Sequence, residues 1–164
     1  GVSFGAISVA ALGIIPQTST IASHLPKAVG AAFSIGIAKT LKLENTPLPF
    51  ESVVLCSFGD ASANHSTAQG AINAAGWAAW QGSPMPIVFL CEDNGIGISV
   101  PTPKGWIEAN FRGRAGLEYM RCNGLDMIDA YRGAPLTGTE AGLVGYWPLN
   151  DGTGNVAASH RSRY

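Results

Sequence analysis

The sequence predicts an α/β fold in which a parallel sheet carries helices on both of its faces. Two apolar runs, residues 53–58 and 86–91, have the length and composition of strands that are covered on both sides. One helical segment, residues 66–80, joins the two runs, so the three form a βαβ unit. A chain of 164 residues is long enough to bury the core that such a unit needs.

The other elements follow in chain order. A first helix is predicted over residues 23–41, where Pro26 falls in the first turn and apolar residues recur on one side. A loop over residues 44–49, which contains two prolines, then leads to the first strand. Beyond the βαβ unit we predict a strand over residues 117–122 and a short helix that begins at Gly124.

Each of the two main strands ends in a polar break. Asp60 follows the first strand and Asn94 follows the second. In open parallel sheets ligands bind outside the carboxyl ends of the strands. Carboxylate and amide oxygens suit Mg²⁺, which usually bridges a protein to a phosphate. The local alternative is that Asp60 caps a helix and Asn94 makes a turn. The occurrence of both at matched strand ends favours a metal-bridged diphosphate site.

The residues around these breaks carry a family resemblance. The stretch that begins at Gly59, GDASANHSTAQGAINAAGWAAWQGSPMPIVFLCEDNGIGISVPTP, resembles the thiamine-diphosphate motif of the alpha subunit of 2-oxo acid dehydrogenases. Upstream, TSTIASHLPKAVGAAFSIGIAK resembles the segment that precedes this motif in the same subunit. The resemblance covers about residues 14–134. It departs from the family where Ala61 replaces a glycine and Asp93 replaces an asparagine, and Ala61 would be strained if the turn required a positive φ.

The resemblance implies a metal site. Asp60 and Asn94 would bind Mg²⁺ through their side chains, and Ile96 would bind it through its backbone carbonyl. Without the resemblance, Ile96 would be read as an ordinary apolar loop residue.

The resemblance also implies contacts with thiamine diphosphate. Ser19 and Ile21 match positions that line the cofactor, and Ala61 and Ser62 match positions that cradle its diphosphate. His24 matches a position close to the cofactor, where it could contact diphosphate or substrate. The alternative for His24 is a local hydrogen bond at the start of a helix. No other catalytic residue is assignable in this chain.

The function implied by the resemblance is oxidative decarboxylation of pyruvate or a branched-chain 2-oxo acid, with transfer of the acyl group to a lipoyl carrier. The implied cofactors are thiamine diphosphate and Mg²⁺. The implied partners are a beta subunit, in a heterotetramer, and the lipoyl acyltransferase of a multienzyme complex. In the family, the glutamate that activates the cofactor usually comes from the beta subunit, so we expect this chain alone to be inactive.

Composition argues against other classes of protein. The formal charge is −1, and the chain contains no run of Lys or Arg that would favour nucleic acid. Its apolar stretches are too short or too interrupted to predict a membrane span. The apolar segment over residues 1–15 lacks an initiating Met and a basic leader, so we expect no signal peptide, a truncated chain and a cytoplasmic location. Three isolated cysteines, Cys56, Cys91 and Cys122, are predicted to be buried thiols.

The end of the chain departs from this family. Residues 142–159, GLVGYWPLNDGTGNVAAS, resemble the opening strand of laminin-G-like, concanavalin-type jelly rolls. We therefore predict a truncated, diphosphate-side thiamine-diphosphate-binding domain over residues 1–134, and a linker with a β-hairpin-like tail of foreign origin over residues 135–164. An ordinary hairpin that finishes the domain is the alternative. For the whole chain, the alternatives are an inactive or chimeric fragment and a carbohydrate-binding module related to jelly rolls.

Overall fold

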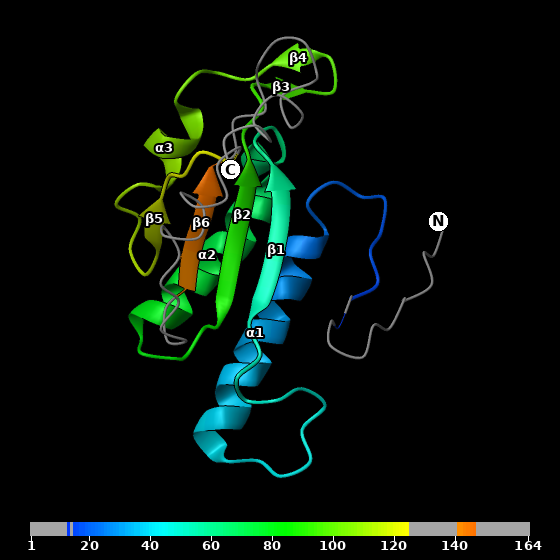
Figure 1. Ribbon diagram of the computed structural model, residues 1–164, viewed down its shortest axis with the longest axis vertical. Helices are drawn as coiled ribbons and strands as arrows, with labels where there is room; N and C mark the ends of the chain where they lie inside the picture. The colour runs from blue at the N-terminus through cyan, green and yellow to red at the C-terminus, as the bar shows by residue number, and fades with distance from the viewer. Residues whose placement is uncertain (1–12, 14, 125–140, 147–164) are drawn as a thin grey trace, which may run out of the picture.

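The computed structural model describes residues 13, 15–124 and 141–146. Its centre is a four-stranded sheet in the order β1-β2-β6-β5, and every pair of neighbouring strands is parallel (Figure 1). A separate antiparallel pair, β3 and β4, lies beyond the carboxyl ends of β1 and β2. In chain order the elements are α1 (His24–Leu41), β1 (Val54–Gly59), the 3₁₀ turn η1 (Ser62–Asn64), α2 (Ser66–Trp80), β2 (Ile87–Glu92), β3 (Ile96–Gly97), β4 (Val100–Pro101), α3 (Trp106–Phe111), β5 (Glu118–Met120) and β6 (Ala141–Tyr146).

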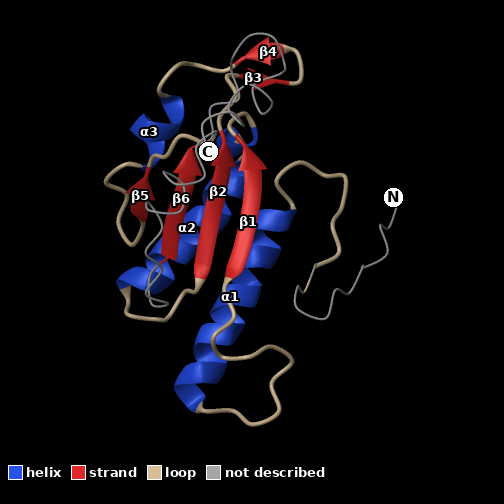
Figure 2. Cartoon of the chain, viewed as in Figure 1, coloured by secondary structure: helices blue, strands red, loops and turns tan. Residues whose placement is uncertain are grey.

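The two long helices lie side by side on one face of the sheet (Figure 2). Cys56 and Phe58 of β1 point into the core beneath these helices, whereas Leu55 on the opposite side of the same strand is 66% exposed. The predicted α/β class is confirmed, but α1 and α2 do not cover both faces as expected. The run over residues 53–58 was interpreted as covered on both sides, but in the structure its side chains alternate between buried and exposed.

Helix α2 has the bounds that the sequence predicts. Its N-terminus is capped by His65, whose Nδ1 accepts a hydrogen bond from the Thr67 backbone N–H at 3.2 Å. Helix α1 packs closely against the loop between α2 and β2. A methyl group at Gly36 would lie 1.9 Å from the Pro84 carbonyl oxygen, so the approach of these two backbones requires glycine.

Strand β6 differs from the prediction of a hairpin-like tail. It lies inside the sheet and pairs in parallel with β2 on one side and β5 on the other. A hairpin would pair neighbouring strands in antiparallel, and jelly rolls are likewise antiparallel. The rest of the stretch that resembles a jelly roll, residues 147–159, lies outside the described residues, as does most of the helix predicted from Gly124. The domain boundary at residue 134 stays a prediction.

The cysteines are buried thiols, as predicted. Burial raises the pKa of the Cys56 thiol to about 11. Burial also raises the pKa of the Cys91 thiol, and the negative charge of the nearby Asp93 acts in the same direction. Within the described part of the chain, no helix is both long and apolar enough to cross a membrane.

Candidate functional site

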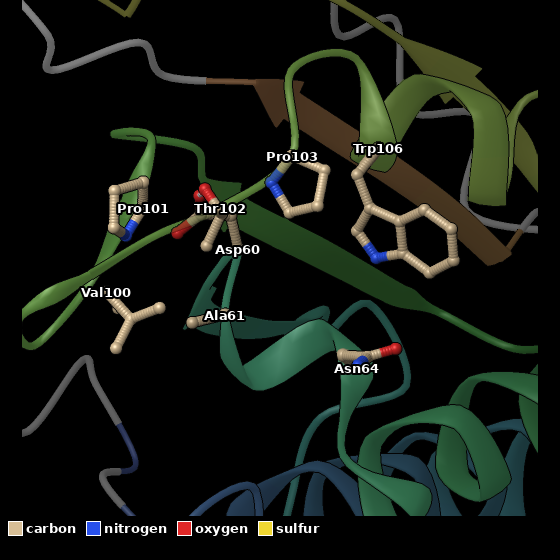
Figure 3. Close-up of a pocket in the computed structure, with 9 residues that line it drawn as sticks. Asp60, Ala61, Asn64, Val100, Pro101, Thr102, Pro103 and Trp106 are labelled. Atoms are coloured by element: carbon tan, nitrogen blue, oxygen red, sulfur yellow. Dashed lines mark hydrogen bonds between the residues drawn. The ribbon is translucent and has the colours of Figure 1, made fainter.

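A cavity of about 330 Å³ opens at the carboxyl ends of β1 and β2. This volume lies at the lower end of the range for small-molecule sites, roughly 300–1,000 Å³. The end of β1 and the turn η1 form one side, while the β3–β4 hairpin and the start of α3 form the other (Figure 3). The lining residues are Asp60, Ala61, Asn64, Gly97, Val100, Pro101, Thr102, Pro103 and Trp106.

Asp60 connects the parts of this site. It is only 3% exposed, and its Oδ2 accepts hydrogen bonds from the Gly95 backbone N–H, at 3.2 Å, and from the Thr102 hydroxyl. Its own backbone N–H donates to the Glu92 carbonyl at 3.2 Å, which ties the end of β1 to the end of β2. The hairpin is closed between its two sides by a bond of 3.0 Å from the Thr102 N–H to the Gly95 carbonyl. One buried carboxylate therefore holds both ends of the hairpin.

The partners of Asp60 are neutral. In the described part of the chain, the salt bridges join Lys39 to Glu51 and join Glu108 to two arginines, so a basic side chain does not pair with Asp60 there. A buried carboxylate is costly unless its charge is matched as well as hydrogen-bonded. The arrangement is therefore suited to an added cation. Among the described residues, no three His, Cys, Asp or Glu side chains form a cluster that could hold a metal ion by themselves.

Asn94 and Ile96 form a turn beside Asp60. The Asn94 Oδ1 accepts a hydrogen bond of 3.0 Å from the Ile96 backbone N–H, which is the local turn that the alternative interpretation expects. Ile96 faces Pro101 across the hairpin, and proline has no backbone N–H to donate to the Ile96 carbonyl. Because Gly95 between them is bound to Asp60, the structure brings all three predicted metal ligands to one region.

Ala61 adopts an ordinary helical conformation, with φ −63° and ψ −38°. It therefore carries none of the strain that a positive φ would cause. Its side chain instead faces Gly97, where an added Cβ would lie 2.5 Å from the Ala61 Cβ. Ser62 begins η1 but does not line the cavity. The backbone N–H groups of Ala63 and Asn64 donate hydrogen bonds within this turn, to the carbonyls of Asp60 and Ala61. The N–H groups of Ala61 and Ser62, which come before them, are therefore the ones suited to bind an anion.

Three predicted cofactor residues lie elsewhere. Ser19 and Ile21 belong to the loop before α1, where Ile21 is 50% exposed, and neither lines the cavity. The His24 Nε2 donates a hydrogen bond of 2.8 Å to the Ser57 carbonyl, which joins α1 to β1. This contact agrees with the local interpretation of His24. A role for these residues toward the cofactor stays a prediction.

Sequence reasoning missed part of the cavity wall. Thr102 and Asn64 were not predicted to be site residues, yet both line the cavity. The feature of the sequence that could have pointed to Thr102 is the proline on each side of it, because these prolines restrict the backbone there to extended conformations.

Residues 7–134, most of the chain, match the family described as Dehydrogenase E1 component. The chain belongs to this family. The predicted resemblance to an alpha subunit of 2-oxo acid dehydrogenases is thereby confirmed at the level of the family.

Curated relatives of this E1-component chain are alpha subunits of 2-oxoisovalerate dehydrogenase. The mouse protein is 28% identical over 117 residues, which are 70% of this chain and 23% of the relative. The Caenorhabditis elegans protein is 30% identical over 117 residues, 70% of this chain and 24% of the relative. The Arabidopsis thaliana alpha 2 protein is 31% identical over 123 residues, 73% of this chain and 23% of the relative. The chain thus spans about a quarter of the length of these relatives.

The relatives correct one prediction. All three are mitochondrial proteins by name. The cytoplasmic location expected from the sequence is contradicted by this finding. That expectation rested on the composition of residues 1–15 alone.

Proposed function

We propose that this E1-component chain is the diphosphate- and Mg²⁺-binding part of a thiamine-diphosphate-dependent 2-oxo acid dehydrogenase. The observation that carries the proposal is Asp60, a buried carboxylate on the cavity wall whose hydrogen-bond donors in the described structure are uncharged. A divalent cation would supply the missing positive charge, and a diphosphate would complete the coordination of that cation.

The residues present fit both groups. A carboxylate, an amide oxygen and a backbone carbonyl, from Asp60, Asn94 and Ile96, are the hard oxygen ligands that Mg²⁺ prefers. The backbone N–H groups of Ala61 and Ser62 would receive the diphosphate at the start of η1. When bound, thiamine diphosphate supplies the electron sink that allows a 2-oxo acid to lose CO₂.

The chain itself contributes binding, orientation and exclusion of water. Val100, Pro101, Pro103 and Trp106 give the cavity apolar lining near the Asp60 carboxylate (Figure 3). An apolar wall lowers the local dielectric constant and strengthens the attraction between the carboxylate and a cation. This lining supports a role in holding the charged end of the cofactor.

The substrate and partners follow from the relatives as further proposals. A branched-chain 2-oxo acid is favoured over pyruvate, because the relatives are named for 2-oxoisovalerate. The acyl group would pass to a lipoyl carrier on an acyltransferase of a multienzyme complex. A beta subunit would complete the cofactor pocket in a heterotetramer, in mitochondria. Residues 1–134 would form the diphosphate side of the domain, and the chain alone would not turn over substrate.

Calorimetric titration tests the binding. We expect thiamine diphosphate to bind the chain in the presence of Mg²⁺, and to lose that binding when EDTA removes the metal. Thiamine, which lacks the diphosphate, should not bind under either condition. Equal binding of thiamine and thiamine diphosphate, or no dependence on Mg²⁺, would contradict the proposal. Release of CO₂ from a 2-oxo acid by this chain alone would contradict its proposed incompleteness.

A further inference from the structure

Thr102 is the point at which the β3–β4 hairpin returns to the edge of the main sheet. It directly follows β4, and its backbone N–H bonds the Gly95 carbonyl on the other side of the hairpin at 3.0 Å. Its hydroxyl donates to Oδ2 of Asp60, which lies 42 positions earlier in the chain. Thr102 therefore joins the hairpin to the carboxylate through its side chain while closing the hairpin through its backbone.

The two side-chain contacts of Asp60 fall on the same oxygen. Gly95 and Thr102 both donate to Oδ2. A carboxylate has two oxygens and about four lone-pair sites, so Oδ1 is the oxygen that would receive a cation. Because both donors are uncharged, they fix the rotation of the carboxylate without neutralising it or repelling a cation.

We propose that Thr102 is a positioning residue for the cation site, a proposal that rests on the proposed function. Its hydroxyl orients the Asp60 carboxylate so that Oδ1 faces the cation, and it holds the hairpin that carries Ile96 against the same group. One hydrogen bond thus sets the relative position of a side-chain ligand that follows β1 and a backbone ligand in β3.

The chemistry of Thr102 suits this role. A branched Cβ restricts the side chain to few χ1 rotamers, and the flanking Pro101 and Pro103 restrict the backbone. The hydroxyl therefore loses little conformational freedom when it bonds Asp60. Valine has nearly the same shape and lacks the donor, and serine keeps the donor but lacks the methyl group. Comparison of the valine and serine variants therefore separates the effect of the hydroxyl donor from the effect of side-chain packing.

The test compares Thr102→Val, Thr102→Ser and the unsubstituted chain, with Thr40→Val as a matched control. The Thr40 hydroxyl bonds the Gly36 carbonyl within α1, and neither residue lines the cavity. Calorimetry would measure the affinity for Mg²⁺ and, separately, for Ca²⁺ in the presence of saturating thiamine diphosphate. Hydrogen exchange without ligand would measure the protection of the Gly95 amide.

We expect Thr102→Val to weaken Mg²⁺ binding by about tenfold, the loss typical of one hydrogen bond to a charged group. Ca²⁺ binding should weaken less, because Mg²⁺ requires near-octahedral geometry and Ca²⁺ tolerates irregular sites. Thr102→Ser should restore the Mg²⁺-to-Ca²⁺ affinity ratio to within about twofold of the unsubstituted value, and Thr40→Val should leave it unchanged. The Gly95 amide should exchange faster in Thr102→Val only.

A purely structural role would lower stability without changing the affinity ratio between the two cations, and that result would overturn the inference. Failure of Thr102→Ser to restore the ratio would also overturn it. If the unsubstituted chain binds Mg²⁺ and thiamine diphosphate while Thr102→Val binds them equally well, the inference fails and the proposed function stands. If the unsubstituted chain shows no Mg²⁺-dependent binding, both fail.

Discussion

A polar side chain follows each of the strands β1 and β2, and the two side chains make different kinds of contact. Asp60 at the end of β1 is buried, and its side-chain partners Gly95 and Thr102 lie 35 and 42 positions away in sequence. Asn94 at the end of β2 is partly buried, and its side chain bonds Ile96, two positions away. Asp60 organises tertiary structure, whereas Asn94 shapes a local turn.

The difference has consequences for function and stability. Loss of Asp60 removes the charge of the proposed cation site and the common anchor of the hairpin. Loss of Asn94 removes a neutral ligand and one local hydrogen bond. Substitutions at the two strand ends should therefore have unequal effects, which the following variants measure in order of expected size.

The largest effect is expected from Asp60→Asn, which keeps the shape of the side chain and removes its charge. We expect Mg²⁺-dependent binding of thiamine diphosphate to fall below detection in calorimetry, with helix content by circular dichroism nearly unchanged. Glu92→Gln is the matched control, because the neighbouring Glu92 is exposed and contacts Asp60 through its backbone carbonyl. Binding by Asp60→Asn at the unsubstituted affinity would remove Asp60 from the site.

The next effect concerns how the hairpin packs on the end of β1. Gly97→Ala would place its Cβ 2.5 Å from that of Ala61 and should lower the free energy of unfolding by about 1–3 kcal/mol, the usual cost of overpacking. The double variant Ala61→Gly, Gly97→Ala should recover much of this loss, because the methyl group moves from one side of the contact to the other. Urea unfolding measures both values.

Gly30→Ala is the control for this pair. Apart from the neighbouring residues and the backbone of α1 itself, no described atom lies within 4 Å of a Cβ at Gly30, so the variant should gain about 0.5–1 kcal/mol from helix propensity. If the change in unfolding free energy of the double variant equalled the sum of the changes in the two single variants, Ala61→Gly and Gly97→Ala, the two residues would not be in contact.

Asn94→Ala should have a smaller effect on binding than Asp60→Asn. The loss of one neutral ligand should weaken Mg²⁺ binding by roughly tenfold or less, and stability should change by about 1 kcal/mol for the local hydrogen bond. The same titration and unfolding experiments apply. A loss of binding equal to that of Asp60→Asn would show that the two strand ends contribute equally, contrary to the comparison.

The smallest effect concerns Cys56, which lies in the body of β1 below its polar end. Burial raises the pKa of this thiol to about 11, so little reactive thiolate forms at pH 8 in the folded chain. Labelling by iodoacetamide, followed by mass spectrometry, should be much slower in the folded than in the unfolded chain. The rate in the folded chain should keep rising with pH until about 11. Rapid labelling of folded protein at pH 8 would contradict the burial of Cys56.

The sequence predicted the features that are encoded locally. The bounds of α2 were predicted to the residue, and the bounds of β1 and β2 were each within one residue. Asp60 was identified from its place at the end of a strand, because the fold class places ligands there. Asn94 makes a turn with its own neighbours, as a polar residue before glycine commonly does.

Features that depend on distant partners were missed. Thr102 could not be recognised, because its contact with Asp60 depends on how the hairpin folds back over the end of β1. The apolar run of β1 also did not indicate that α1 and α2 both lie on the same face of the sheet. The same holds for β6, which was predicted as a hairpin-like tail, because pairing with β2 and β5 depends on the whole sheet and not on its own residues.

The most direct test of the cation site is paramagnetic broadening by Mn²⁺ in the NMR spectrum of the chain, with thiamine diphosphate present. Mn²⁺ replaces Mg²⁺ at oxygen-rich sites and broadens the signals of nearby amides. We predict loss of the amide signals of Ala61, Gly95 and Thr102, with the signal of Trp80 at the far end of α2 retained, and no such loss in Asp60→Asn. Unbroadened signals at Ala61 and Gly95, or the same broadening in Asp60→Asn, would contradict a cation site built on Asp60.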